Sequence, residues 1–402
     1  MKQKVVVIGH GYTSRLGVIR ALGRAGYEVI VVVMTGYNKN GTLNTTKPID
    51  CYSKYVSRVL YCPSDQNRLI TTLLEECADP EQKVIIFTDS DFSAAAVDLN
   101  QERLRDRFLF PNINLEPGAV VAWMDKSRQK EAAREIGLNV AQGWLISIID
   151  GHYDLPIGIL YPCFLKPVAT LYGGKVGLRR CGNEEELRKA LGLLINRRPT
   201  IKVLVEEFKE IETEYALVGF SSGDRVLIPG IIQMKSLSRG RHFGVAMQGE
   251  IMPSDGFEDL IEKFTSFVRR TGFLGVFDID FYKSDGELFF CEMNFRYGGS
   301  GYAYTASGVN LPEIMARCLL GKTVDFDSSV KSPAVFINER MCRDDWEDGI
   351  ISSKEFCKMR KTSAISFIED SEDISPSIQF RKSLLNPIMN AKRLLKRIMR
   401  II

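Results

Sequence analysis

The hydrophobic positions near the start of the chain form short continuous runs, separated by stretches with helical spacing. Residues 5–8 are one such run and end in a Gly-His-Gly sequence, and residues 28–33 and 84–88 are two more. Continuous apolar runs of this length are typical of strands buried on both faces of a parallel sheet. The intervening stretches carry apolar residues three to four positions apart, as in helices that pack on a sheet. We therefore expect an α/β domain over residues 1–118, ending in a loop marked by Pro111 and Pro117.

The pattern changes after this loop. A helical stretch at 120–137 is followed by β-like runs, several of which are joined by short turn sequences such as Ser-Asp-Gly at 284–286. Turns of this composition join antiparallel strands in hairpins. We expect a second domain of α+β type over residues 119–325. The signal is weaker over a C-terminal segment, residues 326–382.

The last residues have a distinct pattern. Apolar residues lie on one side of a helical projection of residues 383–402 and Lys and Arg on the other, and residues 381–402 contain no acidic side chain. This predicts a basic amphipathic tail helix. Such a helix either docks on the protein or a second subunit, or binds an anionic membrane surface. The sequence leaves both alternatives open.

Composition narrows the class of protein. The formal net charge of the 402 residues is only +3, which gives no overall field for nucleic acid. The nine cysteines occur singly, without Cys-x-x-Cys pairs or histidine clusters, and this argues against a zinc site or a disulfide framework. The apolar run at residues 5–8 is too short for a signal peptide or a membrane span. We expect a cytoplasmic protein, with the tail as its contact to the inner face of the membrane if it binds one.

One stretch carries candidate metal ligands. Asp280 and Glu292 fall on consecutive predicted strands joined by a glycine turn, and Glu292, Asn294 and Arg296 alternate along one face. Carboxylates, an amide and a guanidinium together can hold a metal ion and an anion. A solvated sheet face is the commoner explanation for any one of these residues. The whole string favours a site.

The string Glu-Met-Asn-Phe-Arg, residues 292–296, resembles the E-x-N-x-R motif of the ATP-grasp superfamily. Other elements of that superfamily follow its order: Met-Asp-Lys at 124–126, Phe-Leu-Lys-Pro at 164–167, a glycine loop at 172–177 and Val-Glu-Glu-Phe at 205–208. The resemblance covers roughly residues 120–320. It implies a two-lobed ATP-grasp domain with a lid lobe at about 160–208, and it implies ATP with Mg²⁺ or Mn²⁺ as cofactors.

The resemblance also implies roles for residues. Asp280, Glu292 and Asn294 would bind the metal ions, and Arg296 would be the catalytic residue that faces the acyl phosphate and the tetrahedral intermediate. The nucleotide would be bound by Lys126, Lys166, Tyr172, Gly173, Gly174, Gly177, Glu206, Glu207, Phe208, Lys209, Glu214 and Arg241. The resemblance assigns ribose binding to Glu214. Many relatives have a Pro-Gly turn where this chain has Glu-Ile-Glu at 210–212, so Glu212 could bind the ribose instead.

Further strings, at 87–91, 296–300 and 373–376, resemble the branch of D-aspartate ligase and the carbamoyl-phosphate synthase large chain. The opening of the chain, residues 9–26, resembles the Rossmann-like pre-ATP-grasp domain that precedes many ATP-grasp domains. The D-aspartate ligase branch implies a carboxylate–amine ligase that forms an amide through an acyl phosphate and releases ADP and phosphate. Its substrates would be small molecules or lipid-linked precursors of a cell wall or surface polysaccharide. A homodimer would also be compatible with this branch. An ATP-grasp phosphotransferase and a non-catalytic nucleotide-binding protein stay open as alternatives.

The N-terminal domain offers candidate substrate contacts. Gly9 and Gly11 form a strand-to-helix turn whose amides favour anions, although a turn without a ligand explains them equally well. A nicotinamide-binding motif is incomplete here, because its third glycine would be Gly17, which is too distant. Asp89 and Asp91 follow a strand at the edge where α/β sheets bind ligands, and they could hold an ammonium group. A helix-capping role for Asp91 is the alternative.

Overall fold

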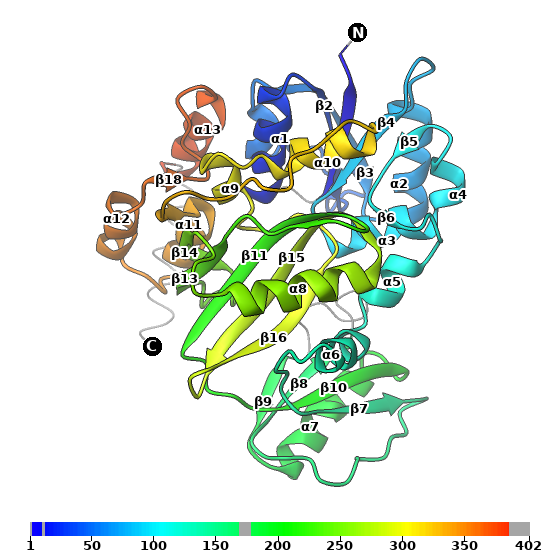
Figure 1. Cartoon of the computed structure of the whole chain (residues 1–402), viewed down its shortest axis with the longest axis vertical. Coiled ribbons are helices and arrows are strands. Elements are labelled where there is room, and N and C mark those ends of the chain that lie inside the picture. The colour runs from blue at the N-terminus through cyan, green and yellow to red at the C-terminus, as the bar shows by residue number, and fades with distance from the viewer. Residues whose placement is uncertain (1, 10–12, 169–177, 386–402) are drawn as a thin grey trace.

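The computed structural model describes residues 2–9, 13–168 and 178–385. Gly11, the glycine loop with Tyr172, Gly173, Gly174 and Gly177, and the tail beyond Leu385 lie outside the described residues. Three units follow one another from top to bottom in Figure 1: an N-terminal domain, a central sheet and a small lobe. The C-terminal helices lie to one side of the first two.

The N-terminal domain is built on a parallel sheet in the order β3-β2-β1-β4-β5. Its central strand β1 is buried on both faces: Val5 and Val7 belong to the core under α1, and Val6 and Ile8 to the core under α2 and α3. The continuous apolar runs predicted this burial. The elements are β1 (Lys4–Gly9), α1 (Thr13–Arg24), β2 (Glu28–Thr35), η1 (Ile49–Tyr52), β3 (Val56–Pro63), α2 (Gln66–Thr72), η2 (Leu73–Cys77), β4 (Val84–Thr88), α3 (Asp91–Leu99), α4 (Gln101–Leu104) and β5 (Phe108–Leu109).

The central sheet has the order β16-β15-β11-β13-β14-β17-β18, with β6 and β12 as short additions, and is antiparallel apart from the last pair. One face carries α8, whose Phe264 and Phe267 pack against Phe281 and Phe290 of the sheet. The opposite face carries polar side chains and also Val218 and Val276, which belong to a core shared with α9, α10 and α1 of the N-terminal domain. The elements are β6 (Asn112–Ile113), β11 (Thr213–Ser222), β12 (Val226–Leu227), β13 (Ile231–Leu237), β14 (Ala246–Met252), α8 (Glu258–Thr271), β15 (Phe273–Ser284), β16 (Glu287–Asn294), α9 (Tyr302–Ala306), α10 (Leu311–Leu319), β17 (Ala334–Ile337) and β18 (Ile365–Ser366).

The small lobe has an antiparallel sheet in the order β7-β10-β8-β9, with α7 on one face. Because β7 pairs with β10, this sheet begins at Gly143, well before the expected start of the lid lobe near residue 160. Two helices, α5 and α6, connect the lobe to the N-terminal domain. The elements are α5 (Ala119–Trp123), α6 (Lys126–Glu135), β7 (Gly143–Ile148), β8 (Cys163–Pro167), β9 (Arg179–Cys181), α7 (Glu184–Ile195) and β10 (Ile201–Glu207).

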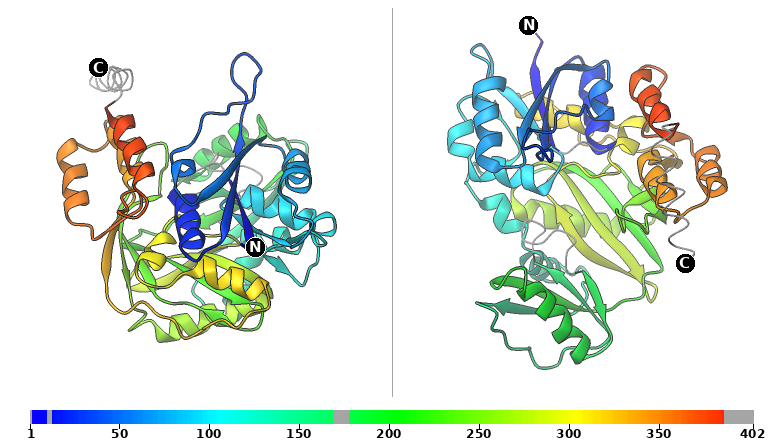
Figure 2. Two further views of the ribbon diagram at one scale, coloured as in Figure 1. Left: turned by 90° about the horizontal axis from the view of Figure 1, so that it is seen from above. Right: turned by 180° about the vertical axis from the view of Figure 1, so that it is seen from behind.

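The C-terminal segment is integrated into the rest of the chain. Its strand β17 pairs with β14 of the central sheet, so the expected boundary near residue 326 does not separate two sheets. Fully buried Arg20 of α1 pairs with Asp373 at 2.9 Å and donates to the carbonyl groups of Phe367 and Ile368. Figure 2 shows the red helix α13 beside the blue helix α1. The remaining helices are α11 (Glu339–Glu347), α12 (Ser353–Lys361) and α13 (Ile374–Leu384).

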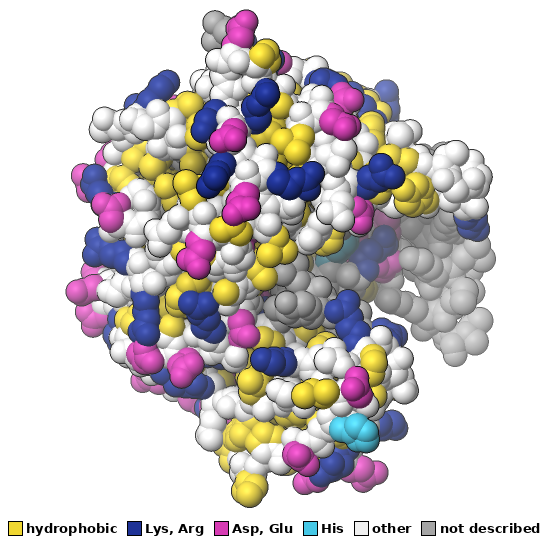
Figure 3. All heavy atoms as spheres, turned by 90° about the vertical axis from the view of Figure 1, so that its right-hand side faces the viewer, with side chains coloured by type: hydrophobic (Ala, Val, Ile, Leu, Met, Phe, Trp, Pro, Cys, Tyr) yellow, Lys and Arg dark blue, Asp and Glu magenta, His cyan; other side chains and the backbone are white. Residues whose placement is uncertain are grey.

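Two surface properties bear on partners. Acidic and basic side chains are interspersed on the face shown in Figure 3, in keeping with the small net charge. Among the helices of the described residues, none is long and apolar enough to cross a bilayer.

Candidate active site

The candidate metal ligands meet on the sheet face opposite α8. In the β15–β16 hairpin, Asp280 pairs in register with Glu292 and Asp278 with Asn294. The Asn294 side-chain amide donates to Asp280 Oδ2 at 3.3 Å. The structure thus brings the three predicted metal ligands together and adds Asp278. The alternation along β15, which places residue 278 on the face of residue 280, was the sequence signal for this residue.

Arg296 lies where the hairpin meets the N-terminal domain. Its Nε donates to Asp91 Oδ1 at 3.0 Å and its Nη1 to Asp278 Oδ2 at 3.5 Å. Burial lowers the pKa of Arg296, but the charges of Asp91 and Asp278 outweigh burial and raise it. Ser90, not Asp91, caps α3, since its side chain accepts from the Ser93 amide. The capping alternative for Asp91 is therefore wrong, and its carboxylate holds Arg296.

The carboxylates at this site repel one another. Burial, followed by the charges of Asp278 and Glu292, raises the pKa of Asp280 well above its usual range. Burial also raises the pKa of Asp278, to about 6, against the opposing charge of Arg296. Glu292 behaves differently: burial opposes its ionisation, but Lys126, at 2.6 Å, lowers its pKa to about 2. A bound cation would relieve the repulsion between these groups.

These residues fit a magnesium ion that is shared with phosphate groups. Mg²⁺ is usually held by one or two carboxylates together with phosphate oxygens and water. Asp280, Glu292 and the Asn294 amide provide such an incomplete donor set. Within the described part of the chain, no group of three or more His, Cys, Asp and Glu side chains is arranged to hold an ion by itself.

Three lysines approach the site from α6 and the small lobe. Lys126 begins α6, after an Asp125 cap, and Lys166 extends from β8 to Glu206 Oε2 at 2.8 Å. Lys130, one helical turn after Lys126, contacts the other oxygen of Glu206. Burial opposes ionisation of Glu206, but Lys166 and then Lys130 lower its pKa. Sequence analysis missed Lys130, although a helical spacing of four from Lys126 signals it.

The predicted adenine hinge follows β10. The backbone amides of Glu207 and Phe208 donate to the carbonyl groups of Gln142 and Pro162, so they are committed to neighbouring strands. Lys209 lies over the ring of Phe289, with 5.2 Å between its Nζ and the ring centroid, and pairs with Glu207 at 3.4 Å. The side chain of Glu206 binds Lys130 and Lys166, and the predicted contact of Glu206 with the nucleotide stays a prediction.

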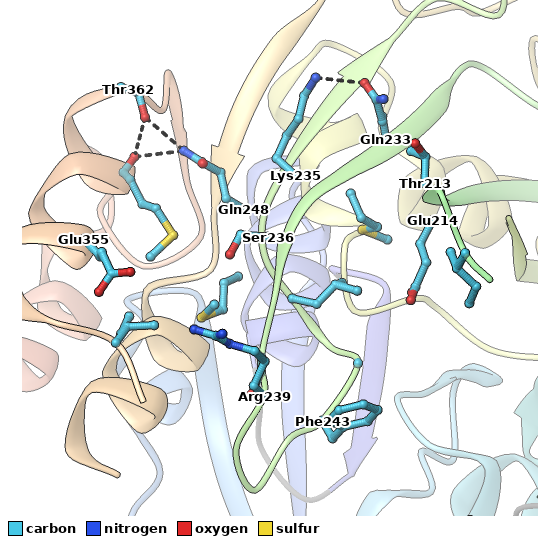
Figure 4. A pocket seen from close by; sticks show the side chains of 18 of the residues that line it. Thr213, Glu214, Gln233, Lys235, Ser236, Arg239, Phe243, Gln248, Glu355 and Thr362 are labelled. Atoms are coloured by element: carbon cyan, nitrogen blue, oxygen red, sulfur yellow. Dashed lines mark hydrogen bonds between the residues drawn. The ribbon is translucent and has the colours of Figure 1, made fainter. Parts of the chain in front are cut away.

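Two other predicted nucleotide contacts are Glu214, with Glu212 as its alternative, and Arg241. Glu214 and Glu212 both line a pocket of about 820 Å³ that extends from β11 across β13 to α12 (Figure 4). Arg241 does not join the lysines of the site: its guanidinium donates to Asp348 at 2.8 and 2.9 Å and lies 3.7 Å from Glu347. Carboxylates of the C-terminal segment thus pair with the guanidinium that was expected to contact phosphate.

The N-terminal candidates lie at the carboxyl ends of β1 and β4. Gly9 and Asp89 are in such close contact that a Cβ on Gly9 would fall 1.6 Å from Asp89 Oδ1. The carbonyl of Gly9 accepts from Arg15 Nη1 at 2.6 Å. Glycine at this position therefore lets Asp89 occupy the turn, and Asp91 continues from there to Arg296.

Comparison with known proteins identifies the family. Residues 125–326 match the sequence model described as the carbamoyl-phosphate synthase L chain, ATP binding domain, which is half of the chain. The chain belongs to this family. Its ATP-grasp domain therefore includes the β15–β16 hairpin, Lys126 and Lys166.

Curated relatives are much longer than this chain. The carbamoyl phosphate synthase large chain of Gemmatimonas aurantiaca is 25% identical over 234 residues, which are 56% of this chain and 21% of that protein. That of Archaeoglobus fulgidus is 26% identical over 359 residues, 83% of this chain and 32% of that protein. This ATP-grasp chain thus spans about a fifth to a third of the curated relatives it matches.

Solved structures share the ATP-grasp fold. The biotin carboxylase domain of Hydrogenobacter thermophilus 2-oxoglutarate carboxylase has a TM-score of 0.63 at 19% identity and covers 83% of this chain and 74% of that chain. L-amino acid ligase from Bacillus licheniformis has a TM-score of 0.58 at 18% identity, covering 83% and 79%. N5-carboxyaminoimidazole synthetase from Staphylococcus aureus has a TM-score of 0.59 at 15% identity, covering 83% and 82%.

Proposed function

We propose that this ATP-grasp chain is an ATP-dependent carboxylate–amine ligase that joins its substrates through an acyl phosphate and releases ADP and phosphate. The observation that carries the proposal is the convergence of two lysines, a carboxylate cluster and an arginine on one sheet face beneath the small lobe. Bound Mg-ATP would supply the phosphoryl group that activates the carboxylate. Asp280, Glu292 and Asn294 are the residues that would hold the metal ions.

The chain's own residues suit the remaining tasks. Lys126 and Lys166 bring positive charge to the place where phosphates would accumulate negative charge. Glu206 holds Lys166 in position from β10. Arg296, fixed by Asp91 and Asp278, would stabilise the oxyanion that forms when an amine attacks the acyl group.

The N-terminal domain would complete the site. We infer that it is a Rossmann-like pre-ATP-grasp domain, residues 1–118, which places Asp91 against Arg296 and Asp89 beside Gly9. These carboxylates suit recognition of an ammonium group before it loses its proton. In the ATP-grasp domain, residues 119–325, the small lobe of 143–207 would act as the lid.

An ADP-release assay with pairs of acids and amines tests the proposal. A ligase releases ADP and phosphate only when both substrates are present. ADP release that needs no amine would indicate a phosphotransferase instead, and nucleotide binding without ADP release under any pair would indicate a non-catalytic protein.

The proposed setting is a cell-wall or surface-polysaccharide precursor, small or lipid-linked. It rests on the resemblance to D-aspartate ligase and on the basic pattern of residues 383–402. Each cation of such a tail near an anionic bilayer contributes about 1 kcal/mol of binding. A homodimer is also part of the proposal, since the structurally similar biotin carboxylase domain is a dimer.

A further inference from the structure

The pocket shown in Figure 4 has a wall that the family match does not include. The match ends at residue 326, whereas one wall of the pocket is α12 (Ser353–Lys361). Glu355, Lys358 and Met359 lie on the same helical face, at spacings of three and four, and all line the pocket. The α12 wall of the pocket therefore belongs to the C-terminal segment, which follows the matched ATP-binding domain.

Helix α11 and the Asp348 cap at its end hold the loop that contributes Ser238 and Arg239 to the pocket lining. Asp345 accepts from Ser238 Oγ at 2.6 Å and from the Arg239 amide at 2.9 Å. His242 lies 3.0 Å from Asp344, and Arg241 is held by Asp348. These contacts hold residues 238–242 on the C-terminal segment, and Figure 4 shows the Arg239 side chain directed into the pocket.

Two cations at the α12 end are available to a ligand. Within the described residues, neither Arg239 nor Lys358 has a carboxylate oxygen within 4.0 Å, whereas Lys235 is paired with Glu250 at 2.8 Å. The Glu355 carboxylate on the same wall accepts from the Ser352 amide at 2.6 Å in the capping box of α12; the hydrogen bonds with Ser352 and then the charge of Arg239 lower the pKa of Glu355. An anionic group is the natural partner for these two cations.

The other end of the pocket reaches the candidate active site. Glu214 lines the pocket, and Ala216, two residues along β11, pairs in register with Asp280. Two residues along a strand span about 7 Å. Between the two ends, Met234, Met247 and Met359 provide a flexible apolar lining. The pocket volume of about 820 Å³ lies within the range of small-molecule sites.

From this arrangement of cations, methionines and active site we propose that the pocket binds a carboxylic acid substrate that carries a second anionic group. Arg239 and Lys358 bind the second anionic group, and the methionines contact the apolar part of the substrate. The inference rests on the proposed ligase function, because the reacting carboxylate is placed at the Glu214 end. The C-terminal segment then determines which acid is activated.

Matched acids test the proposal on the full chain. Suberate and octanoate have the same number of carbons but differ in the second carboxylate. Calorimetry in the presence of Mg-ADP should show tighter binding of suberate. Arg239→Ala and Lys358→Glu should each weaken suberate binding about 5- to 10-fold and leave octanoate unchanged. Lys354→Ala, on α12 but outside the pocket lining, is the control and should bind suberate as the wild type does.

Arg239→Ala keeps the backbone contact to Asp345, and circular dichroism verifies the fold of each variant. Equal binding of the two acids, no binding of either, or unchanged suberate binding in both variants overturns the pocket proposal. ADP release with hydroxylamine as a generic amine reports separately on the ligase function. Selective suberate binding without ADP release would refute the ligase and leave the pocket standing. ADP release that does not depend on the second carboxylate would support the ligase function and refute the pocket proposal.

Discussion

Replacing Arg296 by lysine separates the chemistry of the site from nucleotide binding. Arginine donates through Nε to Asp91 at 3.0 Å and through Nη1 to Asp278 at 3.5 Å. Lysine retains the positive charge, but a single ammonium group lacks the planar fork that spans both carboxylates. The cation will therefore no longer be fixed at the position of the developing oxyanion. Losing one preorganised donor costs about 10²–10³ in kcat, or about 2.7–4 kcal/mol.

The assay needs two measurements. Steady-state ADP release gives kcat, which should fall by about 10²–10³ in Arg296→Lys. Calorimetry with a non-hydrolysable ATP analogue should give nearly wild-type binding. Glu292→Gln is the comparison, because it removes a proposed metal ligand and the partner that Lys126 contacts at 2.6 Å; its analogue binding should weaken. Equal loss of analogue binding in both variants, or a kcat of Arg296→Lys near that of the wild type, would refute these roles.

Three further predictions concern other parts of the chain. Lys130→Met leaves Lys166 as the remaining ion-pair partner of Glu206. Urea unfolding should show that the free energy of unfolding falls by about 1.5–3 kcal/mol. Burial raises the pKa of Glu339 from 4.5 to about 7, so the folded state holds a proton that the unfolded state loses above pH 4.5. Stability should therefore fall as pH rises from 4.5 through 7, by at most about 1.4 kcal/mol per pH unit, and Glu339→Gln should flatten this slope. Full-length protein should sediment with anionic liposomes at low salt, whereas protein ending at Leu385 should not; a supernatant location for both would favour a docked tail.

The parts of the site that lie close together in sequence were predictable. Asp280 and Glu292 are joined by one hairpin, so strand alternation and a glycine turn are sufficient to place them opposite each other. The same periodicity applies to Asp278 and Lys130, but a polar residue on a predicted strand or helix usually faces solvent. Only the tertiary structure shows that these two side chains are buried against charged partners.

Contacts over long sequence distances were not predictable. Arg241 was assigned to phosphate, yet its partner Asp348 follows it by 107 residues, on a segment without a clear pattern. The strands β17 and β18 are too short for alternation to be visible, although β17 extends the central sheet. The role of the C-terminal segment could therefore only be recognised once its neighbours in space were known.

The buried contact between Arg20 and Asp373 has a consequence for folding during synthesis. The partners are separated by 353 residues, and both side chains are fully buried in the finished protein. At translation rates of about 5–20 residues per second, Arg20 waits roughly 20–70 s for its carboxylate to be made. Helix α1 can thus reach its final environment only after the segment around Asp373 has left the ribosome.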